Sequence, residues 1–290
     1  MIIKTVFIFM VKAEQISYIS HLGNVTYLQK AQSMSESFQA LIFGVAAILH
    51  GITGMGFPMI ATSALAFLMP LSQAVAIVAI PSLLMSLLVL CTNNQGSLID
   101  ELRYYAQHYR LLAAMSVIGG IIGVQLLLVL PVAWLYVMMA AVTLYYAGHG
   151  FLSMTGKIGA LTVPTGRLSM AAFGLIAGIV GGATNAMSPI LLIFLFSQTD
   201  DKNRIAKASN LCYLLGKLVQ IFLLQGEYRA FGYGEYALLI ILTAVSMLGL
   251  FGGIRLRTII STTVFKLLIF GILLVLALKI GQSGIAQLTA

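Results

Sequence analysis

Two short segments of this sequence place hydroxyl, amide and glycine residues beside a proline, inside otherwise apolar stretches. The first reads Gly51-Ile-Thr-Gly-Met-Gly-Phe-Pro58, and the second reads Gly181-Gly-Ala-Thr-Asn-Ala-Met-Ser-Pro189. Proline is favoured in the first turn of a helix, so each segment predicts a break followed by a new helix, with Ser188 as the N-cap of the second. The unpaired N–H groups at such a helix start attract negative charge. The two segments therefore predict a site for a small anion.

The side chains expected to complete this site lie in or near the two breaks. Glycines let the backbone approach a ligand closely, and hydroxyl and amide groups can donate hydrogen bonds to it. A histidine one residue before the first break could bind the ligand or couple protons, or be a satisfied interior histidine. The residues expected to contact the substrate are His50, Thr53, Gly54, Gly56, Thr184, Asn185, Ser188, Asn210 and Lys217.

Lys217 lies near the middle of an apolar stretch, on a stripe with Asn210, Tyr213 and Gln220 at helical spacing. Polar stripes of membrane helices face the interior of the bundle. All 8 acidic residues lie outside the apolar stretches, so no carboxylate is available there to hold a cation or relay a proton. The presence of a lysine and the absence of carboxylates in the apolar stretches together favour an anionic ligand. Lys217 either faces the substrate or makes structural hydrogen bonds, and the sequence leaves both roles open.

The composition is typical of a membrane protein with several spans. Of 290 residues, 60% are hydrophobic and 8% are charged, and the mean hydropathy is +1.02. The uncharged runs 38–69, 71–99, 111–156 and 168–199 each exceed the roughly 20 residues that a spanning helix needs. The net charge of +8 does not indicate a nucleic-acid partner, because the basic residues lie in short connections without interleaved aromatic residues. Cys91 and Cys212 form no metal-binding pattern, and we expect neither metal nor cofactor.

The chain aligns with itself at an offset of 130 residues, the separation of Gly119 and Gly249. The offset becomes 131 at the break, where Pro58 meets Pro189, and then returns to 130, where Ala76 meets Ala206. Such a repeat predicts an all-α polytopic membrane protein built from two similar halves. Each half is expected to hold a broken-helix hairpin too short to cross, followed by three spanning helices. These are at 72–93, 108–130 and 132–151, and at 206–225, 235–254 and 258–280.

Three crossings in each half predict that the two repeats are inverted, with their breaks facing each other near the membrane midplane. In that arrangement nine basic residues fall on one side, which the positive-inside rule assigns to the cytoplasm, whereas parallel repeats would divide them. They are Arg103, Arg110, Lys157, Arg167, Lys202, Arg204, Lys207, Arg255 and Arg257.

The predicted units are an N-terminal extension at 1–33, membrane repeat 1 at 34–153, a cytoplasmic connector at 154–167 and membrane repeat 2 at 168–290. The extension differs in character from the rest, since its apolar stretch at 2–11 is only about half the length of a span and polar residues follow it. It also lacks a clear signal-peptide cleavage site. We therefore expect the natural chain to start at Met34.

These motifs resemble the sulfite exporter TauE/SafE superfamily of membrane permeases. The resemblance covers about residues 38–281 and rests on both breaks, on Gly119-Gly-Ile-Ile-Gly123 followed by Pro131, and on residues 249–257. It implies export or import of a small sulfur-containing anion, such as sulfite or an organosulfonate, across a bacterial cytoplasmic membrane. The first break departs from the usual Gly-x-Gly-Gly-Gly, with Phe57 expected to narrow the backbone surface. Thr184 and Asn185 replace smaller residues, and both departures leave the substrate open.

The function predicted from these features is a multi-pass permease that moves a small anion by alternating access, with the substrate and the lipid bilayer as its partners. Self-association into a homo-oligomer is left open. The alternatives are a permease for another small anion, a metabolite or a cation, and a membrane assembly partner. An intramembrane enzyme is disfavoured, because the sequence has no Gly-x-Ser-x-Gly, HExxH or paired intramembrane aspartates.

Overall fold

The computed structural model describes residues 25–66, 68–92, 97–156, 159, 163–164 and 166–289. All regular structure in these ranges is helical, which confirms the all-α part of the predicted fold class. The helices are α2 (Val25–Thr53), α3 (Phe57–Leu65), α4 (Leu71–Cys91), α5 (Leu98–His108), α6 (Arg110–Val129), α7 (Val132–Met154), α8 (Arg167–Thr184), α9 (Ser188–Gln198), α10 (Lys202–Leu223), α11 (Gln225–Ala230), α12 (Tyr233–Arg257) and α13 (Thr262–Thr289).

Five helices of the described chain are long and apolar enough to cross a membrane, namely α4, α6, α7, α8 and α12. The predicted span in α10 has 22 residues, about 33 Å of helix, but its four basic residues make it more polar than these five. Shorter apolar helical segments occur at Ser37–Thr53, Ser188–Gln198 and Leu273–Thr289. The chain is therefore a multi-pass membrane protein.

One helix boundary differs from the sequence-based expectation, and two helices were not expected. α2 begins at Val25 instead of near residue 38, so one continuous helix crosses the expected start of repeat 1. The sequence did not predict α5 or α11, because both are short, carry charged residues and lie in the connections between apolar runs. Residues 1–24 and much of the expected connector lie outside the described residues, and the domain boundaries stay predictions.

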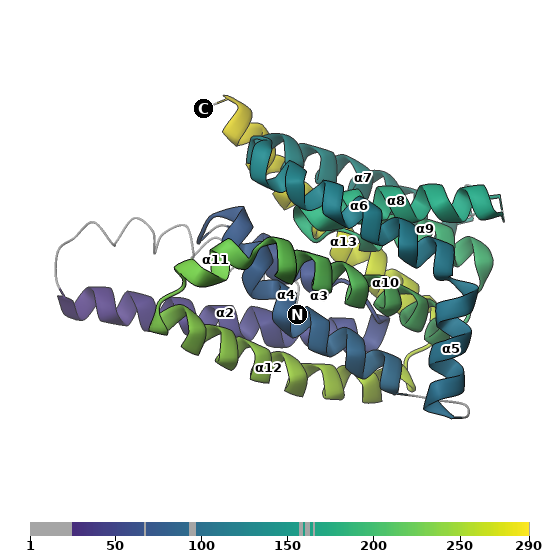
Figure 1. Cartoon of the computed structure of the whole chain (residues 1–290), viewed down its shortest axis with the longest axis horizontal. Coiled ribbons are helices and arrows are strands. Elements are labelled where there is room, and N and C mark those ends of the chain that lie inside the picture. The colour runs from purple at the N-terminus through teal and green to yellow at the C-terminus, as the bar shows by residue number, and fades with distance from the viewer. Residues whose placement is uncertain are drawn as a thin grey trace.

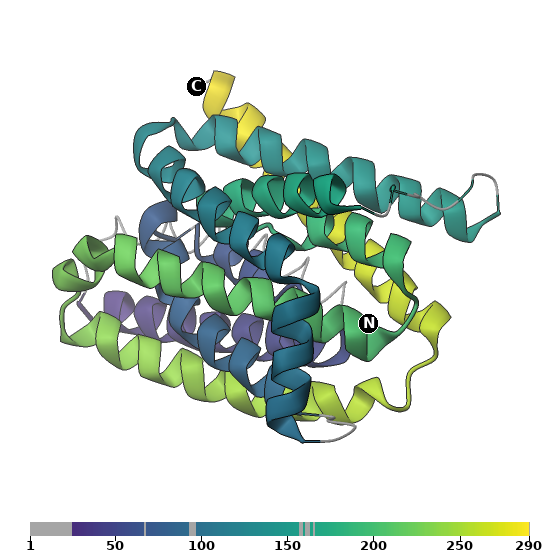
Figure 2. The same ribbon diagram turned by 45° about the vertical axis from the view of Figure 1, so that its right-hand side comes forward.

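Helices of one half pack mainly against helices of the other half (Figures 1 and 2). α2 packs along α12, whereas α6, α7 and α8 lie together on the opposite side with α13, and α4 and α10 lie between these groups. Glycines allow the closest approaches. A Cβ on Gly253 would lie 2.2 Å from the Ile48 carbonyl oxygen, and one on Gly119 would lie 2.2 Å from that of Leu175. The first helix of each repeat therefore packs against the second spanning helix of the other, α2 against α12 and α8 against α6.

The directions of the helices can be read from their contacts. α7 and α13 are equivalent in the repeat, yet Gly150 of α7 packs against Phe270 near the start of α13, while Tyr136 packs against Gly284 near its end. These two helices are therefore antiparallel. Equivalent helices would point the same way in a parallel repeat, so this relation supports the predicted inversion.

The central helices α4 and α10 correspond at an offset of 131. Each of the buried residues of α10 then falls on a buried residue of α4, whereas an offset of 130 pairs Lys217 with Leu87, which is 47% exposed. The predicted pairing of Ala76 with Ala206 is thus wrong by one residue. At the corrected offset Asn210 corresponds to Ala79 and Lys217 to Ser86.

Candidate functional site

The first break lies where it was predicted, between Thr53 at the end of α2 and Phe57 at the start of α3. Gly54 and Gly56 have φ values of 78° and 95°, which favour glycine. A Cβ on Gly54 would also lie 2.3 Å from Cβ of Ala206 on α10. The Thr53 hydroxyl donates to the Leu49 carbonyl at 2.7 Å and lies 2.8 Å from the Met55 carbonyl. The break is held tightly against α10.

The second break repeats this geometry with a different residue. Asn185 takes the place of Gly54 and is the only non-glycine residue with positive φ in the described chain, at 63°. The Thr184 hydroxyl donates to the Val180 carbonyl at 2.8 Å, as Thr53 does in its own helix. Asparagine tolerates the left-handed conformation better than most residues and adds an amide that glycine lacks. The predicted Thr184 and Thr53 hydroxyls are thus both used by the backbone.

The predicted N-cap role of Ser188 is wrong. α9 begins at Ser188 itself, Met187 occupies the N-cap position, and no side-chain cap is formed. The Ser188 hydroxyl instead lies 2.7 Å from that of Tyr213 on α10. The proline still lies in the first turn of α9, as expected. The Ser188 hydroxyl does not cap the helix because it bonds to Tyr213 across the bundle.

α10 contacts the first break through Asn210. The amide nitrogen donates to the Gly54 carbonyl at 2.6 Å and to the Ala206 carbonyl at 2.8 Å. The amide oxygen lies 3.1 Å from Nε2 of His50. All of these groups are buried. His50 and Asn210 therefore meet at the first break, where His50 helps to orient the amide.

About two to three turns further along, α10 contacts the second break through Lys217 and Gln220. Lys217 is 4% exposed, and its ammonium group donates to the side-chain oxygens of Asn185 and Gln220. Gln220 donates to the carbonyls of Gly181 at 3.1 Å and Gly182 at 3.2 Å. The last carbonyls of α8 are thus satisfied by a side chain, and the lysine lies at the negative end of that helix.

At the first break, Arg257 caps the end of α2 as Gln220 caps the end of α8. Its Nε donates to the carbonyls of Gly51 at 2.9 Å and Ile52 at 3.0 Å, in the last turn of α2, and the residue is buried. The sequence placed Arg257 among the basic residues that set membrane orientation, and an arginine at a span end gives no other signal. Its contact with the break depends on the packing of α12 against α2.

Two small cavities are each lined by residues from both halves of the chain. Thr53, Met55 and Gly56 of the first break line one cavity with Ser188 of α9, whereas Asn185 and Lys217 line the other with Pro58 of α3. Each cavity measures about 20 Å³, which is enough for one water molecule. The Asn185 amide also donates to the hydroxyl of Thr62 on α3 at 2.6 Å, a partner that the sequence did not indicate. The two breaks therefore face each other in a closed arrangement.

Phe57, which was expected to narrow the backbone surface of the first break, points its ring into the hydrophobic core. Its ring packs edge-on against Phe43 with centroids 5.4 Å apart, and it is fully buried in the hydrophobic cluster formed mainly by α2, α3, α4 and α12. It lines neither of the two cavities described above. Because Gly56 already sets the turn, the aromatic side chain can point into the core.

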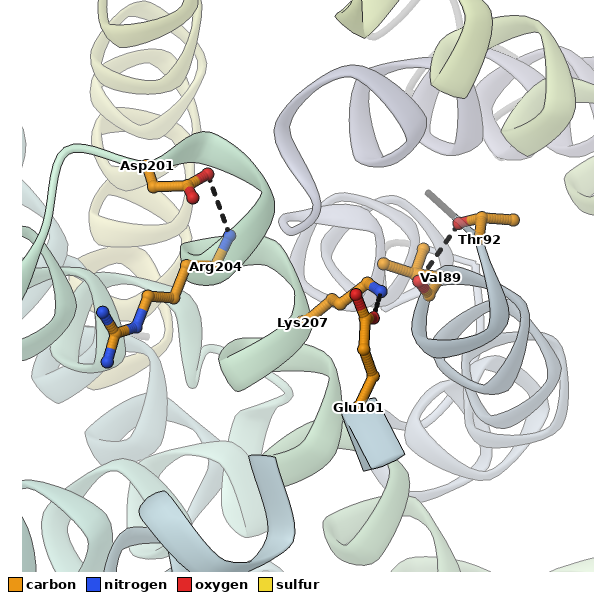
Figure 3. Close-up of polar contacts among 6 residues, drawn as sticks. All are labelled: Val89, Thr92, Glu101, Asp201, Arg204 and Lys207. Carbon is orange, nitrogen blue, oxygen red and sulfur yellow. Dashed lines mark hydrogen bonds and ion pairs between the residues drawn. The ribbon is translucent and has the colours of Figure 1, made fainter. Parts of the chain in front are cut away.

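The start of α10 is held by α5. Figure 3 shows Lys207 of α10 and Glu101 of α5 pointing toward each other, and the two form an ion pair. Lys207 also lies 5.9 Å from the ring centroid of Tyr105. Burial, together with the Glu101 carboxylate, raises the pKa of Tyr105 above its ordinary value, so this phenol stays neutral.

The first turn of α10 is fixed by further contacts. Asp201 caps the helix by accepting from the backbone N–H group of Asn203 at 2.8 Å and from that of Arg204 at 3.2 Å. Figure 3 shows the second of these bonds. The Arg204 guanidinium donates to the hydroxyls of Tyr104 at 2.7 Å and Tyr109 at 3.2 Å. Since α10 also carries Asn210 and Lys217, these contacts set the position of the residues at both breaks.

An all-helical multi-pass protein with two facing breaks and a buried lysine beside one of them has the architecture of a membrane transporter. In the described residues no cluster of His, Cys, Asp and Glu could hold a metal ion. Residues 39–280 match the sulfite exporter TauE/SafE family, and the chain belongs to this family of transporters for sulfur-containing anions. No curated protein and no solved structure matches the chain.

Proposed function

We propose that this protein moves a small sulfur-containing oxyanion, such as sulfite or an organosulfonate, across the cytoplasmic membrane by alternating access. The anion binds between the two breaks. The contacts come from the predicted site residues that lie there. Lys217 supplies positive charge, and Asn185, Ser188 and the backbone of Gly56 line the two cavities.

The observation that carries this proposal is the burial of the Lys217 amino group beside the second break. Its two hydrogen-bond partners are neutral amide oxygens, and no carboxylate of the described chain contacts it. When this amine is protonated it has three N–H donors, of which two are used, so one donor is left for a ligand at the cavity that Lys217 lines. A buried charge without a counter-charge is costly, and an anion that enters the cavity offsets this cost.

The starts of α3 and α9 add to the attraction. Both half-helices begin at their breaks without a side-chain cap, so their first N–H groups keep the partial positive charge of a helix start. The side chain of Ser188 and the backbone of Gly56 line the same cavity from opposite halves. An anion between them would accept hydrogen bonds from both repeats.

Alternating access explains why the cavities are small. A space of about 20 Å³ holds one water molecule but is too small for an oxyanion of sulfur, so binding requires that the two halves move apart. Inverted repeats provide such a movement, because each half can open toward a different side of the membrane. The antiparallel directions of α7 and α13 support this mechanism.

Several basic residues gather at one end of the bundle, which we assign to the cytoplasm. Arg204 contacts Tyr104 next to α6, and Lys202 donates to the Ile260 carbonyl after α12 at 2.8 Å. The starts of α6 and α10 and the end of α12 therefore lie on the same side. Positive charge at these three ends favours the inner face of the membrane.

Counterflow in liposomes tests the proposal. Purified protein is reconstituted with unlabelled sulfite inside, and uptake of labelled sulfite, methanesulfonate and a divalent cation is compared with that of protein-free liposomes. We expect anion uptake to exceed cation uptake and to be lost when the internal sulfite is omitted. Uptake of the cation alone, or equal uptake in both kinds of liposome, would contradict the proposed function.

A further inference from the structure

The first break contains a buried cation with an unused donor. Arg257 is 4% exposed, and only its Nε is engaged in capping α2. The Nη2 atom is buried and has no hydrogen-bond partner in the described part of the chain. Leaving a buried guanidinium N–H unpaired is unfavourable, so this atom is poised to donate to a ligand.

The free Nη2 atom faces the backbone of the break. A Cβ placed on Gly54 would lie 3.5 Å from Nη2, so the donor lies beside the residue that follows the end of α2. Nδ1 of His50, one turn earlier in α2, is a second buried atom without a partner among the described residues. The first break thus has two buried nitrogen atoms without partners, on Arg257 and His50, whereas the second break is contacted by Lys217.

The correspondence between α4 and α10 adds a third group. Ser86 of α4 takes the position of Lys217, which contacts the second break, and we therefore expect Ser86 beside the first break. Its hydroxyl is buried and unpartnered within the described residues, whereas Ser116 and Ser246 donate to carbonyls of their own helices. A hydroxyl that makes no such internal bond remains available for a ligand.

We propose that Arg257, with Ser86, forms a second contact point for the transported oxyanion, at the first break. The planar guanidinium suits an oxyanion, since it presents several N–H donors in one plane. This inference rests on the proposed function. It adds that each break has its own cation, Arg257 at the first and Lys217 at the second.

Two variants test this proposal by titration of the purified full-length protein with sodium sulfite in a calorimeter. In Arg257→Gln the charge is lost, but an amide remains that can cap carbonyls, as Gln220 does for α8. In Ser86→Ala an unpaired hydroxyl is removed, which should leave the melting temperature unchanged or raised. We expect sulfite to bind both variants more weakly, by about tenfold or more for Arg257→Gln.

The matched control is Arg255→Gln, because Arg255 lies on the same helix and is exposed. Wild-type affinity for sulfite in both Arg257→Gln and Ser86→Ala would overturn the inference and leave the proposed function intact. If Arg257→Gln does not fold, Arg257→Lys takes its place. Wild-type affinity for sulfite in both Arg257→Lys and Ser86→Ala would then overturn the inference. Failure of wild-type protein to bind sulfite, methanesulfonate or sulfate would instead remove the proposed function, and the inference with it.

Discussion

Lys217 donates a hydrogen bond to the side-chain oxygen of Asn185, the residue whose left-handed backbone ends α8. This contact joins α10 to the second break through one charged donor and one amide. The same amide donates to Thr62 on α3, so a single residue links a broken helix of one repeat to a half-helix of the other. A change at either residue should therefore alter ligand binding without dismantling the bundle.

Replacement of Lys217 by methionine should weaken sulfite binding by about tenfold or more, because a charge-assisted hydrogen bond is lost. The melting temperature should stay the same or rise, since a buried charge is removed and Gln220 still donates to Asn185 at 2.8 Å. Titration calorimetry and thermal unfolding measure the two effects. Arg167→Met, at an exposed position, is the control, and a lower melting temperature with unchanged affinity would assign Lys217 a structural role.

Asn185→Gly and Asn185→Ala should separate the backbone role of this residue from its side-chain role. Glycine adopts positive φ easily and stands at the equivalent position of the first break, so Asn185→Gly should fold but transport sulfite more slowly. Alanine should also destabilise the protein, by about 1–2 kcal/mol for the left-handed conformation. Thermal unfolding and liposome uptake distinguish the variants. Equal melting temperatures would show that the turn relaxes.

Gly54→Ala should be strongly destabilising, since the new methyl group meets Ala206 and the residue needs positive φ. Gly148→Ala is the matched control, because Gly148 is inside α7 and has no atom within 4 Å of a Cβ placed there. That change should stabilise its helix by roughly 0.5–1 kcal/mol. Melting temperatures in detergent are expected to move in opposite directions, and equal shifts would contradict the described geometry.

Glu101→Gln should lower the melting temperature more than Asp100→Asn, although the two acids are adjacent in α5. Lys207 is buried and would lose its charged partner, whereas Asp100 is exposed. We expect a loss of about 2 kcal/mol or more. The exchanged pair Glu101→Lys with Lys207→Glu should recover part of that loss. No recovery would mean that the ion pair contributes little.

Val129→Cys and Ile259→Cys test whether the repeats are inverted. These residues are equivalent at an offset of 130 and are similarly exposed, at 78% and 80%. With Cys91 and Cys212 replaced by serine, a membrane-impermeant maleimide added to intact cells should label Val129→Cys only. Permeabilised cells should show labelling of both. Labelling of both or neither in intact cells would indicate parallel repeats.

Much of the architecture follows from local patterns, and much of the site does not. The breaks, the short half-helices and the buried stripe on α10 are each set by spacing and turn chemistry within one segment. By contrast, the bond of Ser188 with Tyr213 and that of Thr62 with Asn185 depend on which helix lies across the bundle. Arg257 is the clearest case, because its sequence position suits an inner-face charge and only the packing of α12 on α2 buries it.

The two central helices are equivalent in shape but not in chemistry. Where α10 carries Lys217 and Asn210, α4 carries Ser86 and Ala79. If both halves were chemically identical, the inward-open and outward-open forms would have equal free energy. The unequal side chains remove this degeneracy, so the empty protein should rest with one face open more often than the other. This bias sets the resting population, while the direction of net flux is still fixed by the gradients across the membrane.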